Sequence, residues 1–466
     1  MKKIQKLFTL TILIVLLVPS AGMVFWPTTE TAEKKELQSW PSFMEDGEWN
    51  QNVLSDAGAW FEDHFAFREA LITANSRLNT GVFRTSPLDK VIYGKDGWLF
   101  FNETLDDYLS TNLLSPREIN NIAHNCSLMS SYAKSQESQF VLVIVPNKNT
   151  IYADKMPDYL QAGQEKNRIN LEKALEAENV LYVDLTEDLI SASKEKEVYY
   201  QRDTHWNTDG ALAGYNSLMR SLGLEPETFD PVAGEAVEHS SDLDAMLFPK
   251  DQHSEKELVW PDHSWKYVTE TADNMDEFIQ TDNKEGKGSL LMYRDSFAEA
   301  LVPLLSESFA DAWYSRLLPY NLFQIGQYHP EFTLVERAER RLSSLQEVAI
   351  QPLPTVHLEV SSSRESDTAL EVKEDGDWNL ISGRIPESLL TDTAQIYLSV
   401  SDENGENEKI YSLFQTSGED HAGNGFAGYL MQSSRPEGNC RMRVLIEDDG
   451  GTECVYNEII NWRGKN

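Results

Sequence analysis

The stretch FVLVIVPNK, residues 140–148, decides the fold class of this chain of 466 residues. Phe140–Val145 is a continuous apolar run rich in β-branched side chains, which is typical of a strand buried on both faces of a parallel sheet. Pro146-Asn147-Lys148 ends the run. Since such a strand needs helices on both faces of its sheet, the stretch predicts an α/β fold.

Helix and strand patterns alternate along the residues that follow. We expect a helix near residues 163–178, a strand at Val180–Asp184 and a helix after Trp206. The apolar positions of this last helix keep helical spacing, at Leu212, Tyr215, Met219 and Leu222. Further short strands are expected at Ser289–Tyr293, Ala312–Tyr314 and Phe332–Val335. The alternation predicts a mainly parallel sheet flanked by helices.

The segments that flank this region have other patterns. Residues 41–80 look like a helical extension, whose stripe of Trp60, His64, Phe61 and Phe65 is expected to pack mostly in a core. Residues 346–354 look like a linker. Residues 355–466 predict an all-β, sandwich-like domain of about 110 residues. Its expected strands are Val356–Val360, Ala394–Val400, Lys409–Phe414, Arg441–Ile446 and Cys454–Ile460.

The N-terminus has the pattern of an export segment. Lys2, Lys3 and Lys6 precede an apolar stretch that runs to Trp26. Residues 7–26 would span about 30 Å as a helix, which is one hydrocarbon thickness. We expect residues 1–26 to be an uncleaved signal anchor, with a cleaved signal peptide as the alternative, and residues 27–40 to be a tether. In either case the rest of the chain lies outside the cytoplasm, anchored to the membrane or secreted.

The charge balance restricts the partners. With 76 acidic and 40 basic residues, the net charge is −36. Such a surface repels phosphate backbones, so nucleic-acid binding is excluded, and a neutral sugar meets less repulsion than an anionic polysaccharide. The three cysteines, Cys126, Cys440 and Cys454, make no disulfide framework. Cys440 and Cys454 flank an expected hairpin turn but would not face each other, so no bridge is predicted.

The first candidate for chemistry is Ser296. It follows the expected strand Ser289–Tyr293 in Tyr293-Arg294-Asp295-Ser296-Phe297 and comes just before an expected helix. A serine at this junction lies at the carboxyl end of the sheet, where free backbone N–H groups can stabilise an oxyanion. The alternative is that Ser296 or Asp295 only caps the helix.

The second candidate is Asp203-Thr204-His205-Trp206. Here Asp203 can hold the Nδ1–H group of His205 and leave Nε2 free as a base for Ser296. A capping aspartate with a packed histidine and a pair of metal ligands are the alternatives. Two other Asp/His pairs, Asp251 with His253 and Asp262 with His263, are expected at the surface. His64 is expected to cap or pack in its helix.

These motifs resemble the SGNH-hydrolase-like proteins of the alginate O-acetylation type, which include the bacterial DHHW-motif proteins. The resemblance covers roughly residues 40–345. It rests on Asp203–Trp206, Arg294–Phe297, Trp60–Arg68, Gly94–Phe100 and Val145–Lys148. It implies an extracytoplasmic SGNH-type catalytic domain in which the Asp-x-His element precedes the serine. It also implies that Ser296 is the nucleophile, His205 the base and Asp203 the residue that orients the base.

The resemblance further implies O-acetylation of a cell-surface or exopolysaccharide, with a membrane-bound O-acyltransferase as partner and acetyl donor. By analogy, the C-terminal β-sandwich is carbohydrate-binding. From their places at strand ends, Asn147, Lys148 and Arg294 are expected to bind substrate or the acyl oxygen. No cofactor or metal is expected. The alternatives are a carbohydrate acetyl-esterase with the same triad, a non-catalytic polysaccharide-binding surface protein, and a metal-dependent hydrolase that uses His205.

Overall fold

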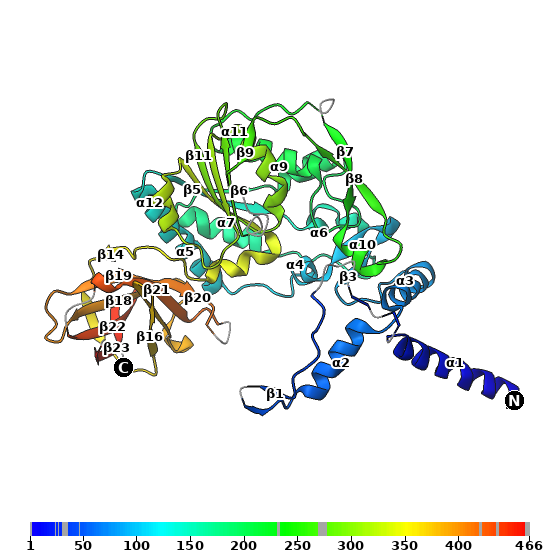
Figure 1. The fold of residues 1–466 in the computed structure, drawn as a ribbon. Helices are drawn as coiled ribbons and strands as arrows, with labels where there is room; N and C mark the ends of the chain where they lie inside the picture. Colours follow the sequence, from blue (N-terminus) through cyan, green and yellow to red (C-terminus); the bar gives the residue numbers. More distant parts are fainter. Residues whose placement is uncertain are drawn as a thin grey trace.

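The computed structural model describes residues 2–23, 25–26, 28–29, 36–45, 47–230, 234–268, 277–418, 422–434 and 438–461. Figure 1 shows an α/β body, a β-rich C-terminal region beside it and an N-terminal arm of helices. This architecture agrees with the predicted fold class. Much of the expected tether, residues 27–40, lies outside the described residues.

The body is built on a seven-stranded sheet with the order β6-β5-β13-β11-β12-β10-β9. The first five of these strands are parallel to one another, whereas β10 is antiparallel to both β12 and β9. The strands are β5 (Gln139–Val145), β6 (Tyr182–Asp184), β9 (Trp265–Tyr267), β10 (Phe278–Asn283), β11 (Ser289–Tyr293), β12 (Asp311–Ser315) and β13 (Phe332–Ala338). The expected mainly parallel sheet is therefore present, with an antiparallel edge.

Alternate residues of the central strand β5 explain its unbroken apolar pattern. Phe140, Leu142 and Ile144 pack into one hydrophobic cluster, and Val141, Val143 and Val145 into another on the opposite face. The first cluster includes side chains from α5 (Pro116–Ser135) and α7 (Asn167–Ala177), and the second from α8 (Thr186–Ser193), α9 (Thr208–Ser221) and α11 (Val302–Ser308). Helices thus cover both faces of the sheet, as the sequence of this strand requires.

Shorter elements surround the carboxyl ends of the parallel strands. These are the hairpins β3 (Val91–Tyr93)–β4 (Leu99–Phe101) and β7 (Glu235–Ser240)–β8 (Ser254–Val259), and the helices α4 (Leu105–Leu109), α6 (Lys148–Ile151), α10 (Asp242–Leu247) and α12 (Phe323–Tyr328). The β7–β8 hairpin lies in a polar stretch for which the sequence predicts no strand. It folds back beside the loop between α8 and α9, where His239 contacts Asp203.

The N-terminal arm contains the helical extension expected over residues 41–80, divided into two helices. It contains α1 (Lys2–Gly22), the short pair β1 (Met44–Glu45)–β2 (Glu48–Trp49), α2 (Val53–His64) and α3 (Arg68–Leu78). Helix α2 ends at His64, and Phe67, which takes a left-handed backbone conformation with φ of 64°, directly precedes α3. The aromatic stripe does form stacked pairs, Trp60 on His64 and Phe61 on Phe65. The stripe is not core, however, because Phe61 is 40% exposed.

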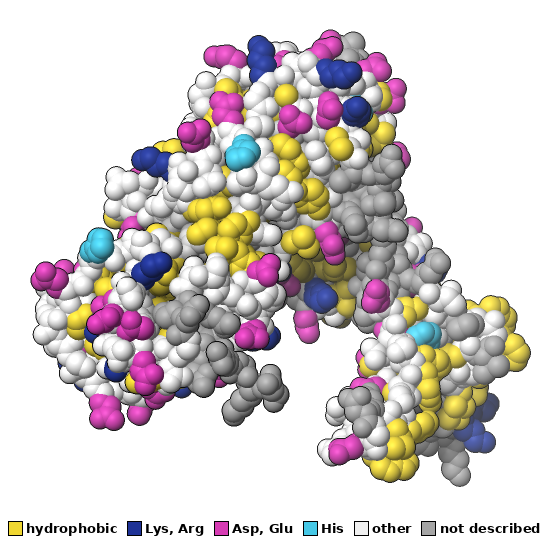
Figure 2. All heavy atoms as spheres, turned by 60° about the vertical axis from the view of Figure 1, so that its left-hand side comes forward, with side chains coloured by type: hydrophobic (Ala, Val, Ile, Leu, Met, Phe, Trp, Pro, Cys, Tyr) yellow, Lys and Arg dark blue, Asp and Glu magenta, His cyan; other side chains and the backbone are white. Residues whose placement is uncertain are grey.

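Helix α1 is long and apolar enough to cross a membrane over Lys3–Gly22, a property that a signal sequence shares. Apolar side chains continue on the surface of the arm beyond this helix. Trp26, Trp40, Trp49 and Leu54 are each more than half exposed. Figure 2 shows such side chains gathered on the lobe at the lower right, apart from the body.

The C-terminal region consists of a six-stranded sheet with the order β14-β19-β18-β22-β23-β15 and a four-stranded sheet with the order β16-β17-β21-β20. The strands are β14 (Thr355–Val356), β15 (Val360–Ser363), β16 (Ala369–Asp375), β17 (Trp378–Arg384), β18 (Gln395–Asp402), β19 (Lys409–Ser412), β20 (Phe414–Thr416), β21 (Gly425–Met431), β22 (Asn439–Asp448) and β23 (Gly451–Asn461). The β22–β23 register pairs Cys454 with Leu445 and Cys440 with Ile460, and all three cysteines are free thiols.

The C-terminal sheets pack directly against the body. In residues 346–354, expected as a linker, the side chains of Ala349, Gln351 and Leu353 are buried. Arg117 of α5 donates hydrogen bonds to the carbonyl groups of Gly423 and Ala394. One hydrophobic cluster joins side chains of α5 to those of both C-terminal sheets. The connection is therefore part of a packed contact and not a free spacer.

Candidate active site

Ser296 lies where β11 leaves the sheet, at the carboxyl end of the parallel strands. The sequence predicts that the chain passes directly from this strand into an α-helix, but the structure differs. A 3₁₀ turn at Phe297–Ala300 follows Ser296, and α11 begins only at Val302. The carboxylate of Asp295 accepts hydrogen bonds from the N–H groups of Phe297 at 2.8 Å and Ala338 at 2.9 Å. Asp295 is thus a capping residue, as one alternative expects, and it holds the turn that presents Ser296.

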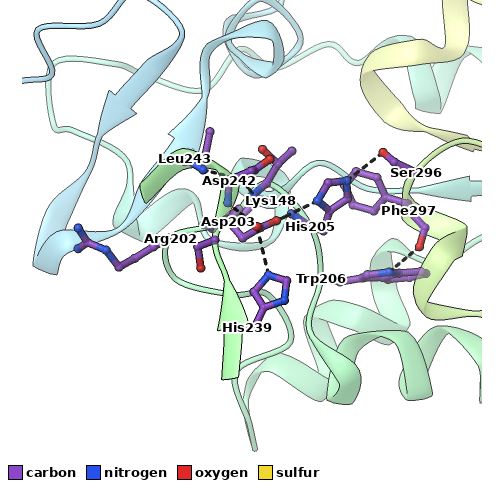
Figure 3. A network of polar contacts seen from close by, with 12 residues as sticks. Lys148, Arg202, Asp203, His205, Trp206, His239, Asp242, Leu243, Ser296 and Phe297 are labelled. Atoms are coloured by element: carbon purple, nitrogen blue, oxygen red, sulfur yellow. Dashed lines mark hydrogen bonds and ion pairs between the residues drawn. The ribbon is translucent and has the colours of Figure 1, made fainter. Parts of the chain in front are cut away.

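His205 bridges Ser296 and Asp203 (Figure 3). Its Nε2 atom lies 2.9 Å from Oγ of Ser296, and its Nδ1 atom lies 2.9 Å from Oδ1 of Asp203. With Nδ1 protonated, the ring donates to the carboxylate and Nε2 accepts the hydrogen bond of the serine hydroxyl. The structure therefore brings all three predicted residues together in one hydrogen-bonded chain.

The buried side chain of Lys148 fixes the loop that carries Asp203. Nζ of Lys148 donates to the carbonyl oxygens of Leu99 at 2.7 Å, Gln201 at 2.9 Å and Asp203 at 2.9 Å. Trp206, the residue directly after His205, donates through Nε1 to the carbonyl oxygen of Phe297 at 2.9 Å. This last bond ties the histidine loop to the serine turn, so the two halves of the site share one support.

Asp203 is 3% exposed, and both of its carboxylate oxygens accept hydrogen bonds. Besides the ring of His205, it accepts the N–H groups of His205 at 2.9 Å and Asp242 at 2.7 Å, and Nε2 of His239 at 3.2 Å. Burial acts to raise the pKa of Asp203, but the hydrogen bonds from His205 and His239 outweigh it and hold that pKa far below its usual value. Asp203 is therefore a carboxylate at neutral pH.

The same contact sets the basicity of His205. Burial acts to lower its pKa, whereas the hydrogen bond and the negative charge of Asp203 raise it, and the net shift is upward. Arg340 opposes the shift through its positive charge. The guanidinium of Arg340 lies over the ring of Phe297, 5.1 Å from its centroid, and within the described residues its Nε and Nη1 atoms have no hydrogen-bond partner.

Sequence reasoning missed His239. This residue comes from the β7–β8 hairpin, and its ring is stacked on Tyr200 with the centroids 3.9 Å apart. Its Nδ1 atom lies 3.5 Å from Oε2 of Glu257, opposite the nitrogen that faces Asp203. Although burial lowers the pKa of His239, its bonds to Asp203 and Glu257 raise it to about 9. A lone histidine in a polar stretch carries no local signal for this role, because the contact depends on how the hairpin folds back.

A metal ion is the alternative use of this cluster. One ligand atom each from Asp203, His205 and Asp242 lie within 4.8 Å of one another. Oδ1 of Asp242, however, already accepts the N–H groups of Thr204 at 2.8 Å and Leu243 at 2.7 Å. Since the carboxylates of Asp203 and Asp242 serve backbone amides and imidazoles, the donor set fits a hydrogen-bonded relay better than metal coordination.

The three residues expected to bind substrate do lie at strand ends, but several of their polar groups bond to the protein itself. Nδ2 of Asn147 donates to Oδ2 of Asp107 at 3.2 Å. Lys148 is 4% exposed and holds the three carbonyl groups named above. Arg294 is 2% exposed, and its Nη1 atom donates to the carbonyl oxygen of Asp295 at 3.2 Å. None of the three lines the cavity beside Ser296 in the described structure. A strand-end position therefore indicates support here, and not contact with a ligand.

A cavity of about 620 Å³ opens beside Ser296 and His205. Its walls come from the loop between α8 and α9, the segment after α9, the β7–β8 hairpin, the segment before β9 and the stretch from Ser296 into α11. Asp262 and His263, expected at an unrelated surface, are part of its wall. By contrast, Asp251 forms an ion pair with Arg77, and His253 lies beside Asp244 with a largely exposed side chain.

Part of the chain is similar in sequence to known proteins. Residues 91–285 match the family model described as the SGNH hydrolase-like domain of acetyltransferase AlgX. A probable alginate O-acetylase AlgJ of Pseudomonas syringae pv. tomato is 28% identical over 187 residues, which are 39% of this chain and 46% of that protein. The AlgJ of Pseudomonas fluorescens is 26% identical over 231 residues, 47% of this chain and 53% of that protein.

Among solved structures, Bacillus cereus PatB1 superposes with a TM-score of 0.42 at 18% identity, over 53% of this chain and 95% of that chain. A DHHW family protein from Eubacterium siraeum gives a TM-score of 0.41 at 14% identity, over 54% of this chain and 91% of that chain. The chain spans about half the length of the curated relatives that it matches.

Proposed function

We propose that this chain, whose residues 91–285 match the model of an SGNH hydrolase-like domain, is an extracytoplasmic O-acetyltransferase that acts on a cell-surface or exopolysaccharide through an acetyl-enzyme at Ser296. The observation that carries the proposal is the hydrogen-bonded chain from Asp203 through His205 to Ser296, with 2.9 Å at each step. The names of the curated relatives, probable alginate O-acetylases, support the acetyl group and the polysaccharide acceptor.

In the first half-reaction, Ser296 takes the acetyl group from an activated acetyl ester or thioester. As Oγ forms a bond to the carbonyl carbon, its proton moves to Nε2 of His205, and Asp203 stabilises the imidazolium. The tetrahedral intermediate then breaks its bond to the donor's oxygen or sulfur. His205 returns the proton to that leaving group, which leaves neutral. The product is an acetyl ester on Ser296 and a neutral His205.

In the second half-reaction, a sugar hydroxyl replaces the donor. His205 removes the hydroxyl proton while the sugar oxygen bonds to the acetyl carbon. The bond from that carbon to Oγ of Ser296 then breaks, and the proton passes from Nε2 to Oγ. The sugar leaves as an O-acetyl ester. Water can enter the same path, so the balance of transfer and hydrolysis depends on how well the bound sugar excludes it.

The oxyanion needs donors that are not already engaged. Phe297, the residue after the nucleophile, does not supply one, because its N–H group is bound to Asp295. The N–H group of Ser296 itself is the nearest backbone candidate. Arg340 does not line the cavity, but its positive charge lies buried behind Phe297, with Nε and Nη1 unpaired within the described residues, and acts on the oxyanion through its electric field. These two groups together are the proposed source of oxyanion stabilisation.

The N-terminal arm fits attachment to a membrane. Helix α1 crosses the bilayer as a signal anchor in this proposal, with Lys3 and Lys6 on the cytoplasmic side. The exposed tryptophans Trp26, Trp40 and Trp49 follow the helix and suit the lipid interface, where tryptophan is enriched. A membrane-bound O-acyltransferase that supplies the acetyl group is then held beside the catalytic domain. Fractionation of cells checks the attachment, since deletion of residues 1–26 should leave no membrane-bound protein.

The carbohydrate-binding interpretation of residues 355–466 stays a prediction. In the described part of this region, the large hydrophobic side chains that are exposed are Met431 and Ile459, and neither is aromatic. The aromatic rings Tyr397, Phe426 and Tyr429 are buried. A sugar bound there would be held through polar groups and not through an exposed aromatic platform.

The test of the proposed function is the acetyl-enzyme itself. Incubation with an activated acetyl ester should add one acetyl group to the intact protein, located by peptide mass spectrometry at Ser296. Ser296→Ala should remove this product, whereas Ser135→Ala, which changes an exposed serine at the end of α5, should not. Labelling that is unchanged in Ser296→Ala would refute the proposal. Retention of activity with a chelator excludes the metal-dependent alternative.

A further inference from the structure

The cavity beside Ser296 has an acidic wall. Six carboxylate side chains contribute to it: Glu227, Asp230, Glu257, Asp262, Glu299 and Glu307. In the part of the chain that the structure describes, no lysine or arginine lines this cavity. The sequence of the neighbouring segments 231–233 and 269–276, which lie outside the described residues, also contains no lysine or arginine.

Cations behind the wall neutralise only part of this charge. Glu299 forms ion pairs with Arg316 at 3.0 Å and with Arg294 at 3.5 Å. Glu257 lies 3.5 Å from His239. Glu307 instead accepts hydrogen bonds from the neutral Ser264, through its hydroxyl at 2.6 Å and its N–H group. Six carboxylates therefore exceed the cations that face them, and the wall is net negative. A carboxylate-bearing ligand would meet like charges in a partly enclosed space, where screening by water is weak.

Aromatic rings line the other part of the cavity. Trp260 and Trp265 both contribute to its wall. The ring of Trp260 is fixed by a hydrogen bond from Nε1 to the carbonyl oxygen of Asp230 at 2.9 Å and by contact with Phe229. Trp265 is stacked on His263 with the centroids 4.2 Å apart. Trp265 is only 7% exposed, so the flat apolar surface for the C–H face of a sugar ring comes mainly from Trp260, which can also attract an ammonium group.

We infer that the acceptor is a saccharide without negative charge, an uncharged or amine-bearing sugar, and not a uronate polymer such as the alginate named for the relatives. The inference rests on the proposed function, because it assigns the acceptor of the same acetyl-enzyme. Carboxylates on the wall hydrogen-bond to sugar hydroxyls, Trp260 holds the ring, and the hydroxyl to be acetylated faces Ser296 and His205. The wall thus selects against the charge that every residue of a polyuronate carries.

The experiment measures how fast different oligosaccharides discharge a preformed acetyl-enzyme. The full chain in detergent is first acetylated with a small activated acetyl ester. Oligomers of equal length are then added: a neutral β-1,4-glucan, a β-1,4-glucosamine and a β-1,4-mannuronate. We expect the first two, or either of them, to speed discharge at least tenfold over water and to yield O-acetyl sugar. Discharge by the mannuronate should stay at the rate of water.

The outcomes separate the two proposals. If no acetyl-enzyme forms, the proposed function fails. If it forms and the mannuronate discharges it as fast as the neutral or amine-bearing oligomers, the acceptor inference fails while the proposed function stands. If only water discharges the acetyl-enzyme, the protein is an esterase. The proposed transfer to a saccharide and the inferred acceptor are then both wrong. Discharge by the glucan but not the glucosamine, or the reverse, identifies which uncharged or cationic acceptor the wall favours.

A change of charge in the wall gives a second test. Asp262→Lys should raise the discharge rate with mannuronate about tenfold relative to that with the glucan, and Asp262→Asn should give a smaller change in the same direction. Glu387→Lys makes the same change of charge at an exposed site in the C-terminal region and should leave the ratio unaltered. A ratio that does not respond to Asp262→Lys contradicts the role given to the acidic wall.

Discussion

His239 donates to the oxygen of Asp203 that His205 does not use. The distance from Nε2 of His239 to Oδ2 is 3.2 Å, and that from Nδ1 of His205 to Oδ1 is 2.9 Å. One buried carboxylate therefore holds two imidazoles. Because the pKa of His239 is raised to about 9, this ring is a cation at neutral pH, and it opposes a second imidazolium on the same carboxylate.

His239→Gln should shift the pH dependence of acetylation of Ser296. Glutamine keeps an N–H donor but removes the positive charge, so Asp203 attracts the protonated His205 more strongly. The pKa of His205 rises, and the acidic limb of the rate profile should move to higher pH by up to about one unit. His253→Gln, at a histidine beside Asp244, is the matched control. A shift to lower pH in His239→Gln would contradict this electrostatic role.

The raised pKa of His205 gives a prediction for the unaltered protein. His205 acts as a base only when neutral, so the acetylation rate should rise with pH and reach half its maximum above 6.5, the usual histidine value. Asp203→Asn removes the group that raises this pKa and fixes the ring. The rate should fall on the order of 10³- to 10⁴-fold, and the remaining activity should have its acidic limb below that of the unaltered protein. An unchanged limb in Asp203→Asn would exclude Asp203 as its cause.

Lys148 should matter for stability and for the geometry of the site, although it does not reach the cavity. Burial lowers the pKa of Lys148 to about 7, yet three N–H groups are needed to serve its three carbonyl acceptors. Lys148→Met leaves these carbonyl groups without a donor and should reduce the free energy of unfolding by about 3 kcal/mol or more. Lys155→Met removes a surface ion pair with Asp96 and should cost less than about 1 kcal/mol. Denaturant unfolding of both variants measures the difference.

The sequence predicts the sheet well because its signals are local. Strand β5 is confirmed from its apolar run, and β11, β12 and β13 are found within a few residues of the predicted positions. The resemblance to SGNH hydrolase-like proteins is confirmed by the family match over residues 91–285. Strands β16, β17 and β21 of the C-terminal region were not expected. Their residues mix glycine and charged side chains with apolar ones, which weakens the alternating pattern.

Local sequence signals also decide which residues of the candidate site could be predicted. Asp203, His205 and Ser296 could be identified because two short motifs carry the residue types that acyl transfer requires. His239 and Arg340 could not, because each reaches the site from a segment without a motif, one from a hairpin and one after β13. Lys148 shows the opposite error. Its charge at the end of a strand suggests a ligand, but the carbonyl groups that it binds come from distant loops that no local pattern reveals.

The contact between α5 and the C-terminal sheets should make the two regions unfold together. Arg117 is 6% exposed and donates to the carbonyl groups of Gly423 and Ala394 and to the side chain of Gln415. Burial lowers the pKa of Arg117 to about 10, so it remains charged at neutral pH. Arg117→Met leaves several buried acceptors unpaired and should lower the free energy of unfolding by about 3 kcal/mol.

Calorimetry of the full chain checks this coupling. The unaltered protein should show one main transition for the body and the C-terminal region, and Arg117→Met should split it into two. Arg341→Met, which removes an exposed ion pair with Glu103, should leave the single transition in place. Two separate transitions in the unaltered protein would mean that residues 346–354 act as the free linker expected from their sequence, in spite of the buried side chains at Ala349, Gln351 and Leu353.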